Sequence, residues 1–364
     1  MKMKKYLYSM VAATLFTATL ANIPISSAQA NKDTVGFIDE RLSKDQKDKL
    51  KEVMKNLDPE DRENVYLFDL DGSFTANRVE LIEEFKKQNK DKLDTNGKLK
   101  KNANANETQT AVKKSGVVET LAYTNPAASC VSASSGPYRK VVSSTGKSRL
   151  TANIYLPIKN SEIVINKYPN EAAHIYTGAI NGNQQVDAGL MFNWGDGVAP
   201  VTATEETWAM STLGMNYSSG TIGNFKMGQT VFMKFYVPAN NQAVLNVEGY
   251  KKDNTYLSAT AVYTVDPSKG FTTNGANMKV KRVTSIGQDF DADPTKHSEN
   301  LTTGSYLNNV KWSNVKVGTT SGTEQLQTAS TTSESCGYKT SNVLVDFVSF
   351  SQETVRVKAG TLTP

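Results

Sequence analysis

The chain has 364 residues, with 41 Lys and Arg against 36 Asp and Glu, which gives a formal net charge of +5. This nearly neutral balance gives no electrostatic reason to expect a nucleic acid partner, because phosphate binding depends on clustered cations. Its two histidines, His174 and His297, exclude a zinc site of three histidines and the His-Glu-x-x-His zinc helix.

The first thirty residues have the pattern of a cleavable signal peptide. Three lysines form a basic start, an apolar run punctuated by threonines covers residues 9–21, and Ala28-Gln29-Ala30 fits the small-x-small cleavage rule. We therefore expect residues 1–30 to be removed, a mature chain that begins at Asn31, and a secreted protein. The apolar run is shorter than the about 20 residues of a membrane span, so no integral membrane span is expected.

Cysteine usage agrees with export. The chain has two cysteines, Cys130 and Cys336, which allow one pairing. In an oxidising compartment this pairing predicts a disulfide, which would close a loop of roughly 200 residues and stabilise the fold by about 4–5 kcal/mol in the chain-entropy model. The alternative is two unpaired buried thiols.

An abrupt fall in charge density predicts the domain organisation. Residues 31–115 contain 36 charged side chains in 85 positions, whereas residues 116–364 contain 38 in 249. We predict a small charged α+β domain over residues 31–90, a Lys/Asn-rich linker over residues 91–115 that buries little apolar surface, and a second domain over residues 116–364.

The charged segment alternates helical and strand signals. Ser43 and Gln46 form a capping box before a helical apolar stripe, and Asp58-Pro59-Glu60 marks a second helix start. A strand is expected at Val65–Phe68, followed by a hairpin turn at Asp71-Gly72. The two helical stripes are Leu50, Val53, Met54 and Leu57, and Val79, Leu81, Ile82 and Phe85.

The later segment alternates with the period of strands. Val231, Met233 and Phe235 face one way, and Phe232 and Lys234 face the other. Many such short runs, separated by Gly, Asn and Pro clusters without interleaved helices, predict a mainly β fold with an antiparallel β-sandwich or jelly roll. Further runs are Leu150–Leu156, Glu162–Ile165, His174–Tyr176, Asp187–Phe192, Ala243–Val247, Tyr256–Tyr263, Met278–Val283, Val310–Val317, Val343–Phe347 and Thr354–Val357.

Three strings give the later segment a family resemblance. They are Ser135-Gly136-Pro137-Tyr138-Arg139, Tyr176-Thr177-Gly178-Ala179 and Val186-Asp187-Ala188-Gly189-Leu190, and Val237–Gln242 extends them. With these strings, residues 116–364 resemble the YrpD-type family of secreted Bacillus proteins. The resemblance implies an exported β-rich domain without an assigned activity, and it supplies no catalytic residues.

Aromatic residues near a Gly/Asp-rich string suggest a recognition surface. Trp194 lies in Asn193-Trp194-Gly195-Asp196-Gly197, a loop-like string in which a tryptophan is costly to expose. Because flat rings stack well on sugar faces, we expect a ligand-binding site formed by Trp194, Asp196, Trp208 and Tyr217. The alternative is that Trp194, Trp208 and Trp312 are core residues.

One acidic string is compatible with calcium. Asp289, Asp291 and Asp293 place hard oxygen ligands at every second residue, and Glu299 follows nearby. Pro294 occupies the place of the EF-hand glycine. Calcium is therefore an expected cofactor, and a solvated acidic loop is the alternative.

No specific catalytic motif is present, so the leading prediction is non-catalytic binding of an extracellular or cell-envelope glycan. His174 is expected to be a strand residue, because no nucleophile elbow accompanies it. A polysaccharide hydrolase or lyase would need two carboxyls roughly 5–10 Å apart, and a structural matrix or surface scaffold is the third alternative. The carboxylates available in or beside the central strands are Glu162, Asp187, Glu205, Glu206 and Glu248.

Overall fold

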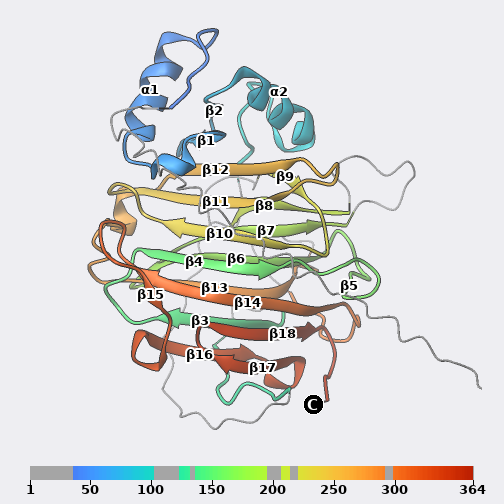
Figure 1. Ribbon diagram of the computed structural model, residues 1–364. Coiled ribbons are helices and arrows are strands. Elements are labelled where there is room, and N and C mark those ends of the chain that lie inside the picture. Colours follow the sequence, from blue (N-terminus) through green and yellow to red (C-terminus); the bar gives the residue numbers. More distant parts are fainter. Residues whose placement is uncertain are drawn as a thin grey trace, which may run out of the picture. The chain divides into compact units, whose positions relative to one another are not determined.

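Two large β-sheets pack face to face (Figure 1), in a computed structural model that describes residues 36–101, 123–131, 136–194, 206–213, 220–291 and 298–363. Almost all strand pairs are antiparallel, which confirms the predicted mainly β, sandwich-like fold. In these described ranges, no helix is long and apolar enough to cross a membrane.

Eleven of the described strands form the larger sheet. They are β1 (Val65–Phe68), β2 (Phe74–Ala76), β4 (Arg149–Tyr155), β5 (Ile163–Val164), β10 (Thr230–Tyr236), β11 (Gln242–Tyr250), β12 (Tyr256–Thr264), β14 (Tyr306–Gly318), β15 (Gln325–Leu326), β17 (Val343–Ser349) and β18 (Gln352–Lys358). Their order is β17-β18-β14-β4-β10-β11-β12-β1-β2, and both β5 and β15 pair with β14.

Seven described strands form the smaller sheet. They are β3 (Tyr138–Ser143), β6 (Glu171–Asn181), β7 (Gln184–Asn193), β8 (Thr207–Leu213), β9 (Ile222–Phe225), β13 (Met278–Gln288) and β16 (Thr332–Tyr338). Their order is β16-β3-β13-β6-β7-β8-β9.

Strand alternation builds the core between the sheets. Val231, Met233 and Phe235 of β10 enter the core, which also contains Ile175 and Leu190 from the smaller sheet. Each side chain of this kind stabilises the fold by about 1.5–3 kcal/mol when it is fully buried. The residues between them on each strand therefore point away from the core, onto the outer faces of the two sheets.

The N-terminal segment, residues 36–101, is joined to the larger sheet. Helix α1 (Lys44–Met54) begins with the predicted capping box, in which Ser43 Oγ accepts from the Gln46 amide at 3.3 Å. β1 pairs in parallel with β12 and antiparallel with β2, and α2 (Val79–Gln88) follows (Figure 1). The helix expected from Asp58 is a single 3₁₀ turn, Pro59–Asp61.

This segment covers part of the outer face of the larger sheet. Lys234 of β10 forms ion pairs with Asp58, Glu60 and Asp61 at 2.8–3.1 Å, and the Tyr236 hydroxyl donates to Asp61 at 2.7 Å. A second apolar cluster joins the same surfaces. Its members from α1 and β1 are Leu50, Val53, Met54, Val65 and Leu67, and its members from the sheet are Tyr236, Val244 and Val262.

The first residues of the predicted linker, residues 91–115, pack against the rest of the N-terminal segment. Leu99 is 3% exposed, its amide donates to the Gly72 carbonyl at 2.9 Å, and it forms a β-bridge with Leu93. Residues 102–115 and the predicted signal peptide lie outside the described residues.

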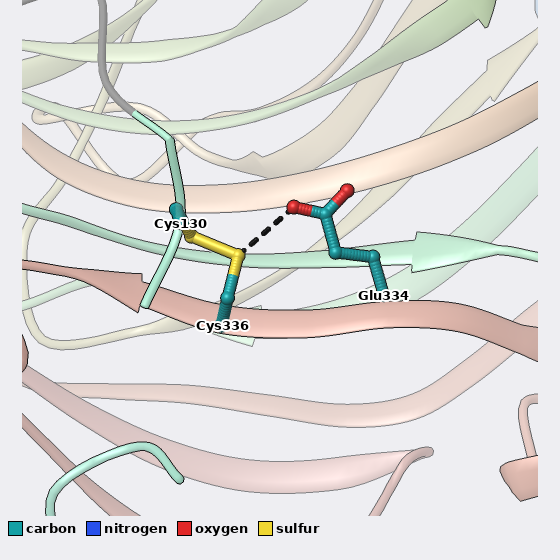
Figure 2. Close-up of side chains that lie close together, drawn as sticks. All are labelled: Cys130, Glu334 and Cys336. Atoms are coloured by element: carbon teal, nitrogen blue, oxygen red, sulfur yellow. Dashed lines mark hydrogen bonds between the residues drawn. A yellow bond between two sulfur atoms is a disulfide. The ribbon is translucent and has the colours of Figure 1, made fainter. Parts of the chain in front are cut away.

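Cys130 and Cys336 form the predicted disulfide (Figure 2). It joins the chain before β3 to β16, across a sequence separation of 206 residues. Both cysteines are buried, on the outer face of the smaller sheet, where they pack with Tyr138 and Val283. This bond therefore restrains nearly the whole sandwich.

Candidate functional site

Trp194 lies directly after β7 and is half-buried. Its ring meets Phe192 edge-on with centroids 6.0 Å apart, and Lys159 Nζ lies 4.5 Å from the ring centroid. The same ammonium pairs with Glu206 at 3.0 Å. Lys159 thus already occupies one side of the indole. The ring area that remains for a ligand is smaller than it would be for a fully exposed tryptophan in a loop.

Two other tryptophans are core residues, which corrects the expectation for Trp208. Trp208 has no exposed surface, and its Nε1 donates to the Pro157 carbonyl at 3.3 Å. Trp312 is 1% exposed and donates to Thr284 Oγ1 at 2.9 Å. Both indoles face the sandwich interior, so neither offers a ring to a ligand. Asp196 and Tyr217 lie outside the described residues.

The acidic string is only partly described. Asp289 is exposed and Asp291 is half-buried, whereas Asp293 lies outside the described residues. Calcium binding at this string stays a prediction.

Within the described ranges, one group of three close metal-ligand side chains occurs, and it is the disulfide with Glu334 (Figure 2). Glu334 Oε1 lies 3.0 Å from Cys336 Sγ and 2.9 Å from Lys140 Nζ. Metal ions bind thiolates, and these sulfurs are bonded to each other. The oxidised cluster therefore does not offer a cysteine metal site.

The candidate catalytic carboxylates that the structure describes have partners within the protein. Glu162 accepts from the Ile158 amide at 2.9 Å, and Asp187 pairs with Lys281 at 2.6 Å. Glu205 lies outside the described residues. His174 is half-buried on β6, and burial lowers its pKa to about 4, so that it is neutral at pH 7.

A site that the sequence reasoning missed lies on the outer face of the larger sheet. Met233 enters the core, so Phe232 beside it points outward. The register places Phe232 opposite Asn153 of β4 on one side and opposite Glu248 of β11 on the other. Phe232 is only half-buried. An aromatic ring thus lies between an amide and a carboxylate on an open part of the sheet.

Two residues further along these strands, the next set of paired positions on the same face adds three tyrosines. Tyr155 lies two residues from Asn153 and opposite Thr230, and Tyr250 lies opposite Tyr256. Tyr250 is 48% exposed and Tyr256 is 58% exposed. These residues come from four adjacent strands, which span about 14 Å. We call this surface the aromatic face: Asn153, Tyr155, Phe232, Glu248, Tyr250 and Tyr256.

The tyrosines of the aromatic face are held in place. The Tyr256 hydroxyl donates to Glu248 at 2.8 Å, and partial burial with this hydrogen bond raises the pKa of Tyr256 to about 12. Lys226 Nζ lies 5.3 Å from the Tyr250 ring centroid. At the other end, the Tyr155 hydroxyl donates to Glu162 at 3.1 Å. The face therefore combines fixed rings with charged and hydrogen-bonding groups.

The aromatic face ends where the N-terminal segment begins. Along β10, Phe232 is half-buried, whereas Lys234 is 1% exposed and Tyr236 is fully buried beneath that segment. Alternation in the sequence placed Phe232 and Tyr256 on strands, but only the register shows that they share one surface.

No family model matches the chain, and no curated protein matches it. Among solved structures, a Scytalido-glutamic peptidase with a peptide-based transition-state analogue is similar over 61% of this chain and 97% of its own, at 12% identity and a TM-score of 0.36. SCP-B, a member of the Eqolisin family of peptidases, in complex with the tripeptide Ala-Ile-His, covers the same shares at 11% identity and 0.35. A functionally unknown protein from Saccharomyces cerevisiae shares 11% identity over 40% of this chain and 66% of its own, at 0.23. At these values no function transfers from any of them.

Proposed function

We propose that this protein is exported and binds an extracellular or cell-envelope glycan through the aromatic face. The observation that carries the proposal is the grouping of Tyr155, Phe232, Tyr250 and Tyr256 on adjacent strands, with the last two about half exposed. Single exposed aromatics are ordinary, but a group of them beside polar side chains is typical of recognition surfaces.

The chemistry of the aromatic face suits sugars. A tyrosine or phenylalanine ring offers a flat apolar surface for the C–H face of a sugar, and sugar hydroxyls need donors and acceptors beside it. Glu248 supplies acceptors, and Asn153 supplies both kinds of group. Because all of these side chains project from strands, their positions are fixed more closely than those of loop residues.

The secretion signal and the disulfide support export. The basic start, the apolar run and the Ala28-Gln29-Ala30 site fit a signal peptide. The Cys130–Cys336 bond fits an oxidising compartment. An exported protein of this kind meets polysaccharides of the envelope and the surroundings.

Retention on insoluble glycans tests the proposal. The mature full chain is incubated with a panel that includes peptidoglycan, chitin, cellulose and plant cell-wall polysaccharides. We expect it to be retained on at least one of them, with no release of reducing sugar. Failure to be retained on any member would contradict the proposal. Release of reducing sugar that is abolished by Glu248→Gln would show a hydrolase or lyase instead.

A further inference from the structure

A buried lysine and a buried aspartate meet where the N-terminal segment is attached to the larger sheet. Lys234 of β10 is 1% exposed, and Asp61 of the 3₁₀ turn has no exposed surface. Lys234 Nζ lies 2.8 Å from Asp61 Oδ1, yet this oxygen accepts no hydrogen bond. Because a C=O bond is about 1.2 Å long, Nζ is at most about 4 Å from the carboxyl carbon. Groups poised to react are about 3–3.5 Å apart, so this pair is close to a reactive arrangement.

Two further carboxylates contact the same nitrogen. Lys234 Nζ donates to Asp58 Oδ2 and to Glu60 Oε1, both at 3.1 Å. Arg149 also pairs with Asp58 at 2.7 Å. Burial opposes ionisation of Asp58, but Lys234 and Arg149 outweigh it and lower the pKa of this carboxyl, so Asp58 stays ionised. The Glu60 side chain is 59% exposed, and it can therefore exchange a proton with both Lys234 and water.

The surroundings of the pair are apolar, with one hydrogen-bond donor. The Tyr236 hydroxyl donates to Asp61 Oδ2 at 2.7 Å, and its ring belongs to the apolar cluster that contains Leu57 and Val262. Burial raises the pKa of Asp61 to about 6 against the opposing effect of Lys234. Burial also opposes the charge of Lys234, although the carboxylates outweigh it and raise the pKa of this ammonium. Transfer of a proton from the ammonium to the carboxylate gives a neutral amine and a neutral acid, which costs less in such a site than in water.

We propose that Lys234 and Asp61 condense to an amide bond, with Glu60 as the proton carrier, and that this bond fastens the N-terminal segment to the larger sheet. The amine nitrogen bonds to the carboxyl carbon of Asp61, and the bond from this carbon to its hydroxyl breaks. The nitrogen gives one proton to Glu60, and Glu60 passes a proton to the hydroxyl, which leaves as water. The Tyr236 hydroxyl stabilises the charge that develops on the other oxygen. The reaction consumes no oxidant and no co-reactant.

Fixed geometry makes this condensation possible without an enzyme. Two groups held in contact react as if each were present at very high concentration, and the buried site excludes the water that would reverse the reaction. The freshly folded chain contains the ion pair, in which Asp61 still titrates, and the reaction converts this form slowly. The proposal is independent of glycan binding at the aromatic face.

A second buried pair provides an internal control. Lys281 is 1% exposed, and its Nζ lies 2.6 Å from Asp187 Oδ1 on the smaller sheet. The other group that this nitrogen contacts is the amide oxygen of Gln185, at 2.7 Å. An amide does not accept a proton at neutral pH, so no proton carrier of the Glu60 kind contacts Lys281 there. We therefore expect the Lys281–Asp187 pair to remain ionic.

Mass spectrometry of the mature full chain tests the proposal. The folded protein is incubated at neutral pH, then reduced, denatured and weighed intact, and its peptides are mapped. We expect the loss of one water molecule and a branched peptide that joins Lys234 to Asp61. An unchanged mass after prolonged incubation, or a loss of water without this branched peptide, would overturn the proposal. A branched peptide that joins Lys281 to Asp187 would overturn the requirement for a proton carrier.

Variants test the role of each group. Glu60→Gln should slow formation of the bond by about a hundredfold, the lower end of what general acid–base catalysis contributes. Glu63→Gln, at an exposed carboxylate of the same segment, should leave the rate unchanged. Lys234→Arg keeps a cation beside Asp61 and should retain the full mass. If Lys234→Arg does not fold, Glu60→Gln still decides, because it alters an exposed side chain. Bond formation in Glu60→Gln at the wild-type rate would show that Glu60 carries no proton and that the proposed reaction is wrong.

Discussion

Tyr250 and Tyr256 lie edge to face across the paired ends of β11 and β12, with ring centroids 5.5 Å apart and an interplanar angle of 78°. Edge-to-face pairs of this kind are worth about 0.5–1.5 kcal/mol beyond the burial of their area. Each ring therefore restrains the other while about half of it stays in solvent. A preorganised surface loses less side-chain entropy when a ligand binds, which favours recognition at this position.

Reduction of the Cys130–Cys336 disulfide should lower stability substantially. The bond closes a loop with a sequence separation of 206 residues. In the chain-entropy model its loss costs about 5 kcal/mol. Thermal melting with and without a reductant measures the effect, and a Cys130→Ala/Cys336→Ala variant is the control that should not respond. An unchanged melting temperature on reduction would contradict the role assigned to this bond.

Trp208→Ala should cost about 3–5 kcal/mol of unfolding free energy, because it empties a fully buried position. Trp194→Ala, the matched variant at a half-buried ring, should cost less. Urea denaturation of both variants gives the comparison. Equal losses would mean that Trp194 contributes to the core as much as Trp208 does.

Lys234→Met should loosen the N-terminal segment. Lys234 is the common partner of Asp58, Glu60 and Asp61, and its removal leaves the fully buried Asp61 without its cation. Breaking a buried ion pair in this way costs about 3–5 kcal/mol. Lys311→Met, at an exposed position of the same sheet, should change stability little. Similar melting of the two variants would contradict this account of how the segment is attached.

Asp61 should give stability a pH dependence. Burial raises its pKa to about 6, above the value of 3.8 for an unperturbed aspartate. The folded state therefore holds this proton more tightly, so the contribution is present in full below about pH 4 and is lost as pH rises through 6. Asp61→Asn removes the titration. The stability of the wild type relative to this variant should thus fall from pH 4 to pH 6, by at most about 1.4 kcal/mol per pH unit.

Melting curves of both proteins over this range provide the measurement. His174 acts in the opposite direction, because its lowered pKa makes stability rise with pH, but it is present in both proteins and cancels in the difference. A difference that stays constant or grows between pH 4 and pH 6 would contradict the raised pKa.

Local signals in the sequence predicted local structure well. The Ser43–Gln46 capping box, the strand at Val65–Phe68 and the alternation of Val231 and Met233 each depend on neighbours in the chain, and the structure has all three. The two cysteines also predicted their own pairing, because no other partner existed.

Long-range register was not predictable in the same way. The fall in charge density did not reveal that β1 would pair with β12 of the sandwich, since that pairing depends on which sheet edge is open. Nor did the sequence distinguish a core tryptophan from an exposed one, so Trp208 was wrongly assigned to a ligand-binding site. The aromatic face depends on Phe232 and Tyr250 coming from different strands, and their shared surface follows only from the pairing of β10 with β11.

Binding isotherms of a Tyr250→Ala/Tyr256→Ala variant test the central claim most directly. They are measured on the glycan that retains the wild type, with Tyr168→Ala as the control, because Tyr168 is 47% exposed outside the aromatic face. Stacking on an aromatic ring is worth about 1–3 kcal/mol for nucleic acid bases, and a similar scale for sugars predicts at least a tenfold loss of affinity in the double variant. We expect wild-type affinity in Tyr168→Ala and near-wild-type melting in both variants. Unchanged affinity of the folded double variant would contradict glycan recognition by the aromatic face.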